Sequence, residues 1–293
     1  MTERSTGRLR TPAMRRRTLL ALPALGLVPT ALLSACTEEP TVPDAESGVP
    51  AAPDGDGGVE VVAYGDDPAQ LAELHRPQGP SRGVVVVIHG GFWKAAYDLT
   101  LGQPLARSLA ARGWTAWNIE YRRVGNGGGT PETFDDVAAA IDALAGVEGL
   151  DLSTVVTLGH SAGGHLAVWA AGRTGGLVPV THAISQAGVL DLVESDRAGL
   201  GDGAATALLG HAAGPADAAW DPQQQLPLDV PVWCVHGVDD AVVPLAQSEG
   251  YVAAARAAGA QAEVVRVEGD HFVVIDPATP AWQAQLDILD AIG

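Results

Sequence analysis

Short apolar runs alternate with amphipathic stretches along residues 59–292 of this chain. Residues 84–88 are four valines followed by an isoleucine, and an unbroken β-branched run is typical of a strand buried on both faces of a parallel sheet. Apolar runs predict strands at residues 59–63, 69–75, 83–89, 115–121, 154–158, 182–186, 231–235 and 262–267. Helices are predicted between them, at residues 99–112, 131–145, 162–171, 245–258 and 281–292. This alternation predicts an α/β fold, with a mainly parallel central sheet flanked by helices.

The alternation breaks between residues 191 and 231, where Gly, Ala, Asp and Gln dominate. We interpret this stretch as a short cap insert with little regular structure of its own. Residues 59–293 together have the length of a single domain. We therefore expect one α/β domain that carries a cap.

The first 35 residues have the composition of an export signal. Six arginines lie within residues 1–17, and residues 18–35 carry no charge. A basic segment followed by an apolar one predicts a secretory signal peptide. Pro23 and Pro29 interrupt the apolar run, so a permanent membrane helix is the weaker interpretation. Arg16 and Arg17, with the leucines behind them, resemble a twin-arginine export signal.

Residues 33–36, Leu-Ser-Ala-Cys, resemble the lipobox of bacterial lipoproteins, in which the cysteine is acylated and becomes the new N-terminus. Cys36 would then anchor an exported protein to the cell membrane, outside the cytoplasm, and the lipid would be its only membrane contact. The alternative is ordinary secretion with Cys36 as a bystander. Residues 36–58 hold four prolines and six acidic residues but no basic one, which predicts a disordered acidic tether.

The balance of acidic and basic residues limits the kinds of partner that the protein can bind. The formal net charge is -18, from 17 basic and 35 acidic residues. Nucleic-acid binding needs a basic surface, so this balance argues against it. Two cysteines, Cys36 and Cys234, cannot form a disulfide framework. No His, Asp and Glu cluster stands at metal-ligand spacing, and we expect neither a metal nor another cofactor.

A candidate nucleophile follows the predicted strand at residues 154–158. The chain continues as Gly159-His160-Ser161-Ala162-Gly163 and enters a predicted helix. This is the G-x-S-x-G sequence in the strand–turn–helix setting that gives it meaning. Ser161 would occupy a strained turn in which only small residues fit two positions away on either side. The alternative is a Gly-Ser loop in which Ser161 caps the helix.

A nucleophilic serine also needs N–H donors for the oxyanion that forms on the attacked carbonyl. The backbone of Ala162, at the start of the helix, is one candidate. The others are expected in the loop after the strand at residues 83–89, which reads His89-Gly90-Gly91-Phe92-Trp93. Adjacent glycines let backbone N–H groups turn toward a site, as in the HGGG-type loop of esterases. A generic strand-to-helix turn is the alternative.

The general base is expected among eight histidines. We expect His75 and His211 at the surface, His89 bracing the glycine loop, His160 and His165 held by the serine turn, and His182 and His236 in strands. His271 remains, in a loop that can deliver its imidazole to Ser161. The acid that holds its tautomer is Asp240 or Asp239, after the strand at residues 231–235. Only one of two consecutive residues can face His271, and we favour Asp240.

The order Ser161, Asp240, His271 is that of α/β-hydrolases, and residues 59–293 resemble this superfamily. The HGG-Phe-Trp loop, Glu-Tyr-Arg at residues 120–122 and GHSAGGH at residues 159–165 are similar to its esterase branch, which holds kynurenine formamidases and hormone-sensitive-lipase-like carboxylesterases. Residues 236–244 match the acid loop of the superfamily, and this match selects Asp240. The resemblance implies Ser161 as nucleophile and His271 as base. It also implies backbone oxyanion donors, which are Gly91, Phe92 and Ala162.

The glycine loop departs from HGGG at Phe92. Phe92 and Trp93 would wall the acyl or alcohol pocket, with core packing of Trp93 as the alternative. The predicted function is hydrolysis of small-molecule carboxylic esters through an acyl-enzyme. An aryl-formamidase and a prolyl-oligopeptidase-like peptidase are alternatives that act on amides. A further alternative is an exported binding lipoprotein that keeps the fold without turnover.

Overall fold

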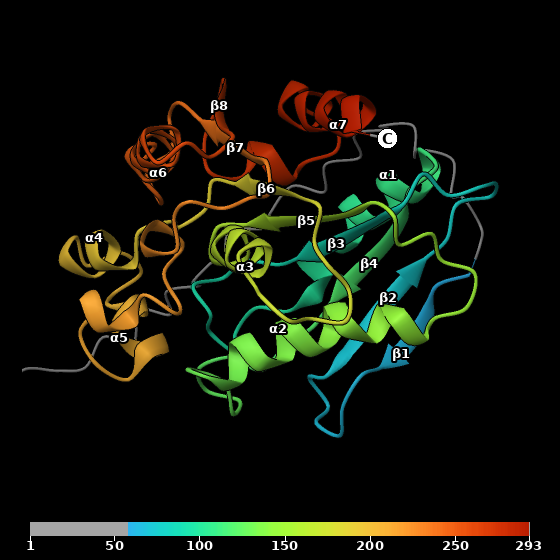
Figure 1. Cartoon of the computed structure of the whole chain (residues 1–293), viewed down its shortest axis with the longest axis horizontal. Coiled ribbons are helices and arrows are strands. Elements are labelled where there is room, and N and C mark those ends of the chain that lie inside the picture. The colour runs from blue at the N-terminus through green and yellow to red at the C-terminus, as the bar shows by residue number, and fades with distance from the viewer. Residues whose placement is uncertain (1–57, 293) are drawn as a thin grey trace, which may run out of the picture. The chain divides into compact units, whose positions relative to one another are not determined.

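An eight-stranded sheet organises residues 58–292, which are the residues that this computed structural model describes (Figure 1). The strands lie in the order β1-β2-β4-β3-β5-β6-β7-β8. β1 pairs with β2, and β2 with β4, in antiparallel fashion, whereas all pairs from β4 to β8 are parallel. The strands are β1 Glu60–Ala63, β2 Leu71–His75, β3 Val84–Ile88, β4 Thr115–Ile119, β5 Val155–His160, β6 His182–Gln186, β7 Val232–Gly237 and β8 Ala262–Val267. The mainly parallel sheet that the sequence predicts is confirmed.

The valine run forms β3, at the centre of this sheet. Its five residues are at most 1% exposed. Val84, Val86 and Ile88 pack in the cluster that includes α2, whereas Val85 and Val87 pack in the cluster that includes α1 and α7. Successive side chains of a strand point to opposite faces, so a strand covered on both sides is apolar at every position.

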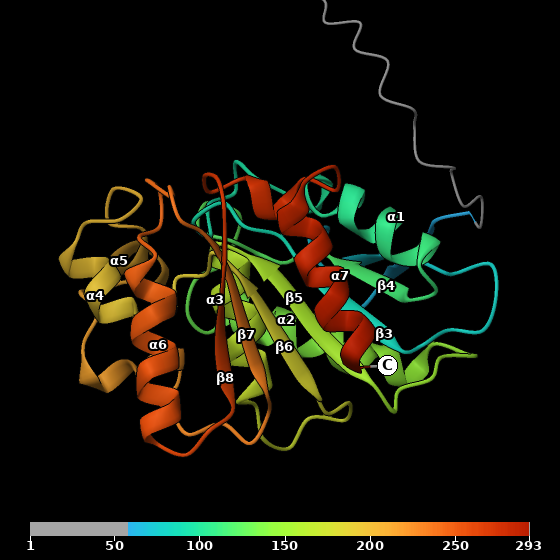
Figure 2. The same cartoon turned by 90° about the horizontal axis from the view of Figure 1, so that it is seen from above.

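Helices cover both faces of the sheet (Figure 2). α1 Gln103–Ala111 and α7 Pro280–Ile292 pack on one face, and α2 Glu132–Asp142, α3 Ala162–Ala171 and α6 Ala246–Ala257 pack on the other. Short 3-10 turns precede α1, follow α2 and precede α7: η1 Leu99–Leu101, η2 Ala143–Gly146 and η5 Val273–Ile275. The two long helices predicted at residues 99–112 and 131–145 are therefore each an α-helix joined to a 3-10 turn.

The cap insert at residues 191–231 is more regular than the sequence predicts. It contains α4 Leu192–Arg197 and α5 Ala204–Leu209, followed by the 3-10 turns η3 Pro215–Asp217 and η4 Pro222–Gln224. The Asp191 side chain caps α4 by accepting the Glu194 N–H. Each helix has six residues, fewer than two turns, so no helical period can show in the sequence.

The carboxyl ends of the parallel strands meet at one edge of the sheet, and the candidate residues lie in the loops that follow β3, β5, β7 and β8. Among the helices of residues 58–292, none combines the length and the apolar character that a bilayer span requires. The predicted signal peptide at residues 1–35, Cys36, and all but the last residue of the predicted tether at residues 36–58 lie outside the described residues.

Candidate active site

Ser161 sits in a strained turn between β5 and α3. Its φ of 55° and ψ of −117° belong to a region that residues other than glycine rarely adopt. A Cβ on Gly159 would lie 2.0 Å from the Gly163 carbonyl oxygen, and a Cβ on Gly163 would lie 2.1 Å from that of Ile88. Close packing therefore requires both glycines. The Ser161 side chain makes no capping hydrogen bond to α3. The alternative in which Ser161 only caps this helix is therefore excluded.

The glycine loop after β3 lies directly against the serine turn. β3 and β5 are parallel neighbours, with Ile88 opposite Gly159, so the two chains leave the sheet side by side. A Cβ on Gly90 would lie 3.1 Å from Ser161 Cβ. The loop that could hold an oxyanion is therefore next to the candidate nucleophile.

Several backbone N–H groups of this region donate to no acceptor within the described part of the chain, and those of Gly91, Phe92 and Ala162 are among them. Ala162 is the first residue of α3, where a helix leaves its N–H groups without intrahelical partners. Phe92 has a φ of 51°, and its strained backbone belongs to the same loop. N–H groups that the fold does not use are available to a developing oxyanion.

Asp240 and His271 are joined by a hydrogen bond. His271 Nδ1–H donates to Asp240 Oδ2 at 2.6 Å, and Asp240 Oδ1 accepts the backbone N–H groups of Val242 and Val243 at 2.8 Å each. The Asp240 side chain has no exposed surface, whereas Asp239 is exposed. The structure therefore brings Asp240, not Asp239, to His271.

The surroundings of Asp240 keep its carboxylate charged. Burial by itself raises the pKa of this carboxyl, but hydrogen bonds from His236, His271 and the Val243 backbone outweigh burial and hold the pKa of Asp240 well below its ordinary value. A charged acceptor at Nδ1 keeps the proton of a neutral His271 on that nitrogen. Nε2 is then left as a free base.

His160 connects the serine turn to the loop of His271. Its Nε2–H donates to the His271 carbonyl oxygen at 2.9 Å, and the two rings are 4.5 Å apart between centres. Because His160 immediately precedes Ser161, this contact brings the loop of His271 to the serine turn, although among residues 58–292 no hydrogen bond joins the Ser161 hydroxyl to His271. Burial, and after it the charge of His271, lowers the pKa of His160 to about 3, so its ring is neutral at pH 7. Sequence reasoning missed this bond, which joins residues 111 positions apart.

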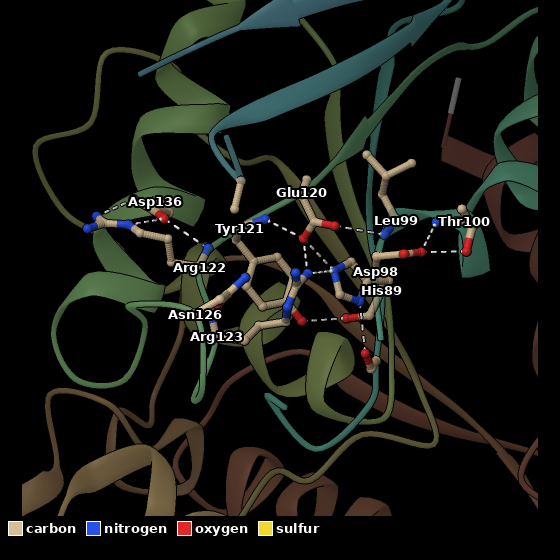
Figure 3. A network of polar contacts seen from close by, with 12 residues as sticks. His89, Asp98, Leu99, Thr100, Glu120, Tyr121, Arg122, Arg123, Asn126 and Asp136 are labelled. Atoms are coloured by element: carbon tan, nitrogen blue, oxygen red, sulfur yellow. Dashed lines mark hydrogen bonds and ion pairs between the residues drawn. The ribbon is translucent and has the colours of Figure 1, made fainter. Parts of the chain in front are cut away.

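A buried polar network braces the glycine loop from behind (Figure 3). His89 Nδ1–H donates to the Gly90 carbonyl oxygen at 2.8 Å, and its Nε2 accepts from Arg123 at 3.0 Å. Arg123 also pairs with Glu120, and the Tyr121 hydroxyl donates to the His89 carbonyl oxygen at 2.8 Å. The bracing role predicted for His89 is confirmed. The sequence analysis did not predict the bracing role of Glu120 and Arg123. The available signal was the presence of charged residues directly after a buried strand.

Two predicted placements are wrong. Trp93 does not wall a pocket, because its indole is fully buried and packs edge-on against His165, with 5.1 Å between ring centres. This is the core-packing alternative. His75 is not at the surface, because it lies on β2 with 4% of its area exposed, beside Glu73. His211 is exposed, and His182 and His236 lie in β6 and β7, as predicted.

Other reactive groups do not compete with this site. Within residues 58–292, no group of three or more His, Cys, Asp or Glu residues is placed to hold a metal ion. Cys234 is fully buried in β7, and burial raises the pKa of its thiol to about 12. A thiol of that kind behaves as a small apolar side chain.

Sequence comparisons match the chain to one family model and to two proteins that are named as esterases. A family model described as BD-FAE matches residues 73–254, more than half of the chain. Esterase LipC of Mycobacterium tuberculosis is 38% identical over 114 residues, which are 36% of this chain and 28% of that protein. The probable isoprenylcysteine alpha-carbonyl methylesterase ICME of Oryza sativa subsp. japonica is 33% identical over 115 residues, 36% of this chain and 27% of that protein. The chain thus aligns with just over a quarter of each relative.

The similarity to a solved structure extends over much more of the chain. The apo form of Thermogutta terrifontis esterase 2 has a TM-score of 0.67 at 25% identity, and the match covers 80% of this chain and 94% of that one. That esterase has also been described with butyrate bound and phosphonylated by sarin. The sheet order and this likeness identify the fold as that of an α/β-hydrolase.

Proposed function

Because the chain belongs to the BD-FAE family, we propose that it is a carboxylesterase-like serine hydrolase of small-molecule esters. One observation carries this proposal, the hydrogen bond of 2.6 Å between Asp240 and His271, formed beside the strained turn of Ser161. A charged carboxylate on Nδ1 of a histidine is the arrangement that activates a neighbouring hydroxyl as a nucleophile. The two curated relatives and the solved structure bear esterase names, which supports the same class.

In the proposed reaction, His271 Nε2 removes the Ser161 proton while Oγ attacks the ester carbonyl carbon. The N–H groups of Gly91, Phe92 and Ala162 stabilise the oxyanion. His271 then gives its proton to the departing alcohol oxygen, which leaves an acyl-enzyme. Water, deprotonated by the same imidazole, cleaves the acyl group and restores Ser161.

Hydrolysis of p-nitrophenyl acetate and butyrate by the full chain tests this function. We expect turnover by the wild-type chain, and a loss on the order of 10⁴-fold or more in kcat for Ser161→Ala. The matched control is Ser153→Ala, because Ser153 is exposed and lies before β5. Rates no higher than those of buffer would favour the binding-protein alternative. Turnover of formanilide without turnover of esters would favour an aryl-formamidase.

We also propose that the protein is exported and anchored to the membrane by a lipid on Cys36. The arginine-rich start, the uncharged run at residues 18–35 and Leu-Ser-Ala-Cys at residues 33–36 support this proposal. Two acyl chains anchor stably where one does so only marginally. The acidic segment that follows would hold the hydrolase domain away from anionic lipid headgroups, outside the cytoplasm.

A further inference from the structure

Lys94, the one lysine in the chain, lies between the glycine loop and the cap. Its Nζ donates to the Gly201 carbonyl oxygen at 2.8 Å and lies 5.9 Å from the centre of the Phe92 ring. Gly201 belongs to the cap turn, which we define as residues 198–203, between α4 and α5. Lys94 therefore bridges two parts of the chain that are 107 residues apart.

The Phe92 ring packs on the same turn. A Cβ on Gly201 would lie 2.5 Å from Phe92 Cδ1, so the ring is against the backbone of the cap turn. Gly201 also has a φ of 60°, which favours glycine. Phe92 is half-buried, and its N–H is one of the proposed oxyanion donors. The cap therefore touches the glycine loop at a residue of the proposed machinery.

Backbone hydrogen bonds hold the two ends of the cap turn but not its middle: the N–H groups of Ala198, Gly199 and Leu200 donate to α4, and the Leu200 and Gly203 carbonyl oxygens accept from α5. Gly199, Gly201, Asp202 and Gly203 have φ values from 59° to 77°. The backbone N–H groups of Gly201 and Asp202 donate to no acceptor among residues 58–292. Ordering a glycine-rich turn costs conformational entropy, so contacts from other parts of the chain stabilise the middle of the turn, at Gly201 and Asp202. Lys94 and Phe92 supply such contacts.

We propose that Lys94 is a positioning residue that latches the cap turn onto Phe92 and so limits the size of ester that the site accepts. This inference rests on the proposed esterase function and deepens it. The Lys94 ammonium donates a charge-assisted hydrogen bond in a partly buried setting, where such bonds are stronger than neutral ones. With the bond intact, the cap turn stays against the glycine loop. Without it, the turn can leave Phe92 and make room for larger substrates.

Lys94→Met in the full chain tests the latch, because methionine keeps an apolar stem over Phe92 but loses the charge and the donor. We expect kcat/KM for p-nitrophenyl octanoate relative to acetate to rise about tenfold, mainly through KM. Lys94→Arg can still donate to Gly201 and should keep the wild-type ratio. Arg197→Met is the matched control, because it removes a cap cation that pairs with Glu194 in the exposed part of α4.

Hydrogen exchange of the amides of residues 199–207 gives a readout that needs no turnover. Exchange should be faster in Lys94→Met and unchanged in Lys94→Arg and Arg197→Met. Gly201→Ala is a second route to the same substrate shift, because its Cβ collides with Phe92 and leaves Lys94 in place.

Unchanged exchange in Lys94→Met would overturn the latch. Faster exchange with an unchanged ratio of octanoate to acetate hydrolysis would overturn the size limit. If the wild-type chain hydrolyses no ester, the exchange measurement still decides whether Lys94 holds the cap turn, and the failure belongs to the proposed function alone.

Discussion

Replacing Asp240 by asparagine should disable the proposed site with little change in its shape. One carboxylate oxygen accepts the N–H groups of Val242 and Val243 at 2.8 Å each, and the other faces His271 Nδ1 at 2.6 Å and His236 Nε2 at 3.2 Å. Asparagine has to place its carbonyl oxygen where the two backbone donors point, so its NH₂ group faces His271. Nδ1 must then accept a hydrogen bond, and the imidazole proton moves to Nε2. The free base that Ser161 needs is lost.

The same substitution in another serine hydrolase sets the scale of this effect. In a serine protease, the same substitution costs about 10⁴-fold in kcat by selecting the wrong tautomer. Because the backbone donors fix the amide orientation here, we expect a loss of about 10³- to 10⁴-fold in kcat at pH 7. KM should change little, since the Asp240 side chain has no exposed surface. Steady-state hydrolysis of p-nitrophenyl butyrate gives both constants, and thermal unfolding checks that the variant is folded.

Asp239→Asn is the matched control, because it makes the same change one residue away on an exposed side chain. We expect its kcat to stay within about twofold of the wild-type value. An equal or larger loss in Asp239→Asn would assign the acid to Asp239. If Asp240→Asn kept more than about a tenth of the wild-type kcat, the tautomer reasoning would be refuted.

Three further predictions concern stability and location. Burial lowers the pKa of His89 and His160 to about 3 and that of His165 to about 4, below the value of about 6.5 in an unfolded chain. The folded state then binds fewer protons, so the free energy of unfolding should fall by up to about 1.4 kcal/mol per pH unit for each histidine as the pH drops from 6.5 toward 4. Urea unfolding at pH 7 and pH 5 measures this, and equal stabilities would contradict it. Glu120→Leu leaves Arg123 buried without its carboxylate partner and should lower the free energy of unfolding by about 3–5 kcal/mol. A loss below about 1 kcal/mol, measured by urea unfolding, would mean that the buried pair does not brace the loop. Cys36→Ser should move the protein from the membrane fraction to the soluble one, and unchanged fractionation would defeat the lipid anchor.

The layers of the fold could be predicted because the buried strands are short apolar runs and the long helices between them are amphipathic. The unbroken valine run is typical of a strand covered on both faces, and β3 is such a strand. The serine turn was recognisable for a similar reason, because close packing around Ser161 admits only glycine at residues 159 and 163. Local constraints of this kind can be recognised in a sequence because they restrict residues that are close together along the chain.

Contacts between segments that are far apart along the chain cannot be recognised in this way. The hydrogen bond from His160 to the His271 carbonyl depends on how two strand ends meet, and no spacing in the sequence encodes it. His75 has polar neighbours along the chain, but its position on β2 turns it inward. Which of Asp239 and Asp240 faces the histidine depended on the geometry of one turn. The residues alone left Asp239 and Asp240 open, the resemblance of residues 236–244 to a known acid loop selected Asp240, and it is Asp240 that bonds to His271.

Intact-mass analysis of the full chain after treatment with a fluorophosphonate tests most directly whether Ser161 is an activated nucleophile. We predict one adduct per chain, mapped by peptide sequencing to Ser161, absent in Ser161→Ala and formed far more slowly in Asp240→Asn. Ser153→Ala should label like the wild-type chain. No adduct on a folded wild-type chain, or an adduct that persists in Ser161→Ala, would contradict the proposed triad.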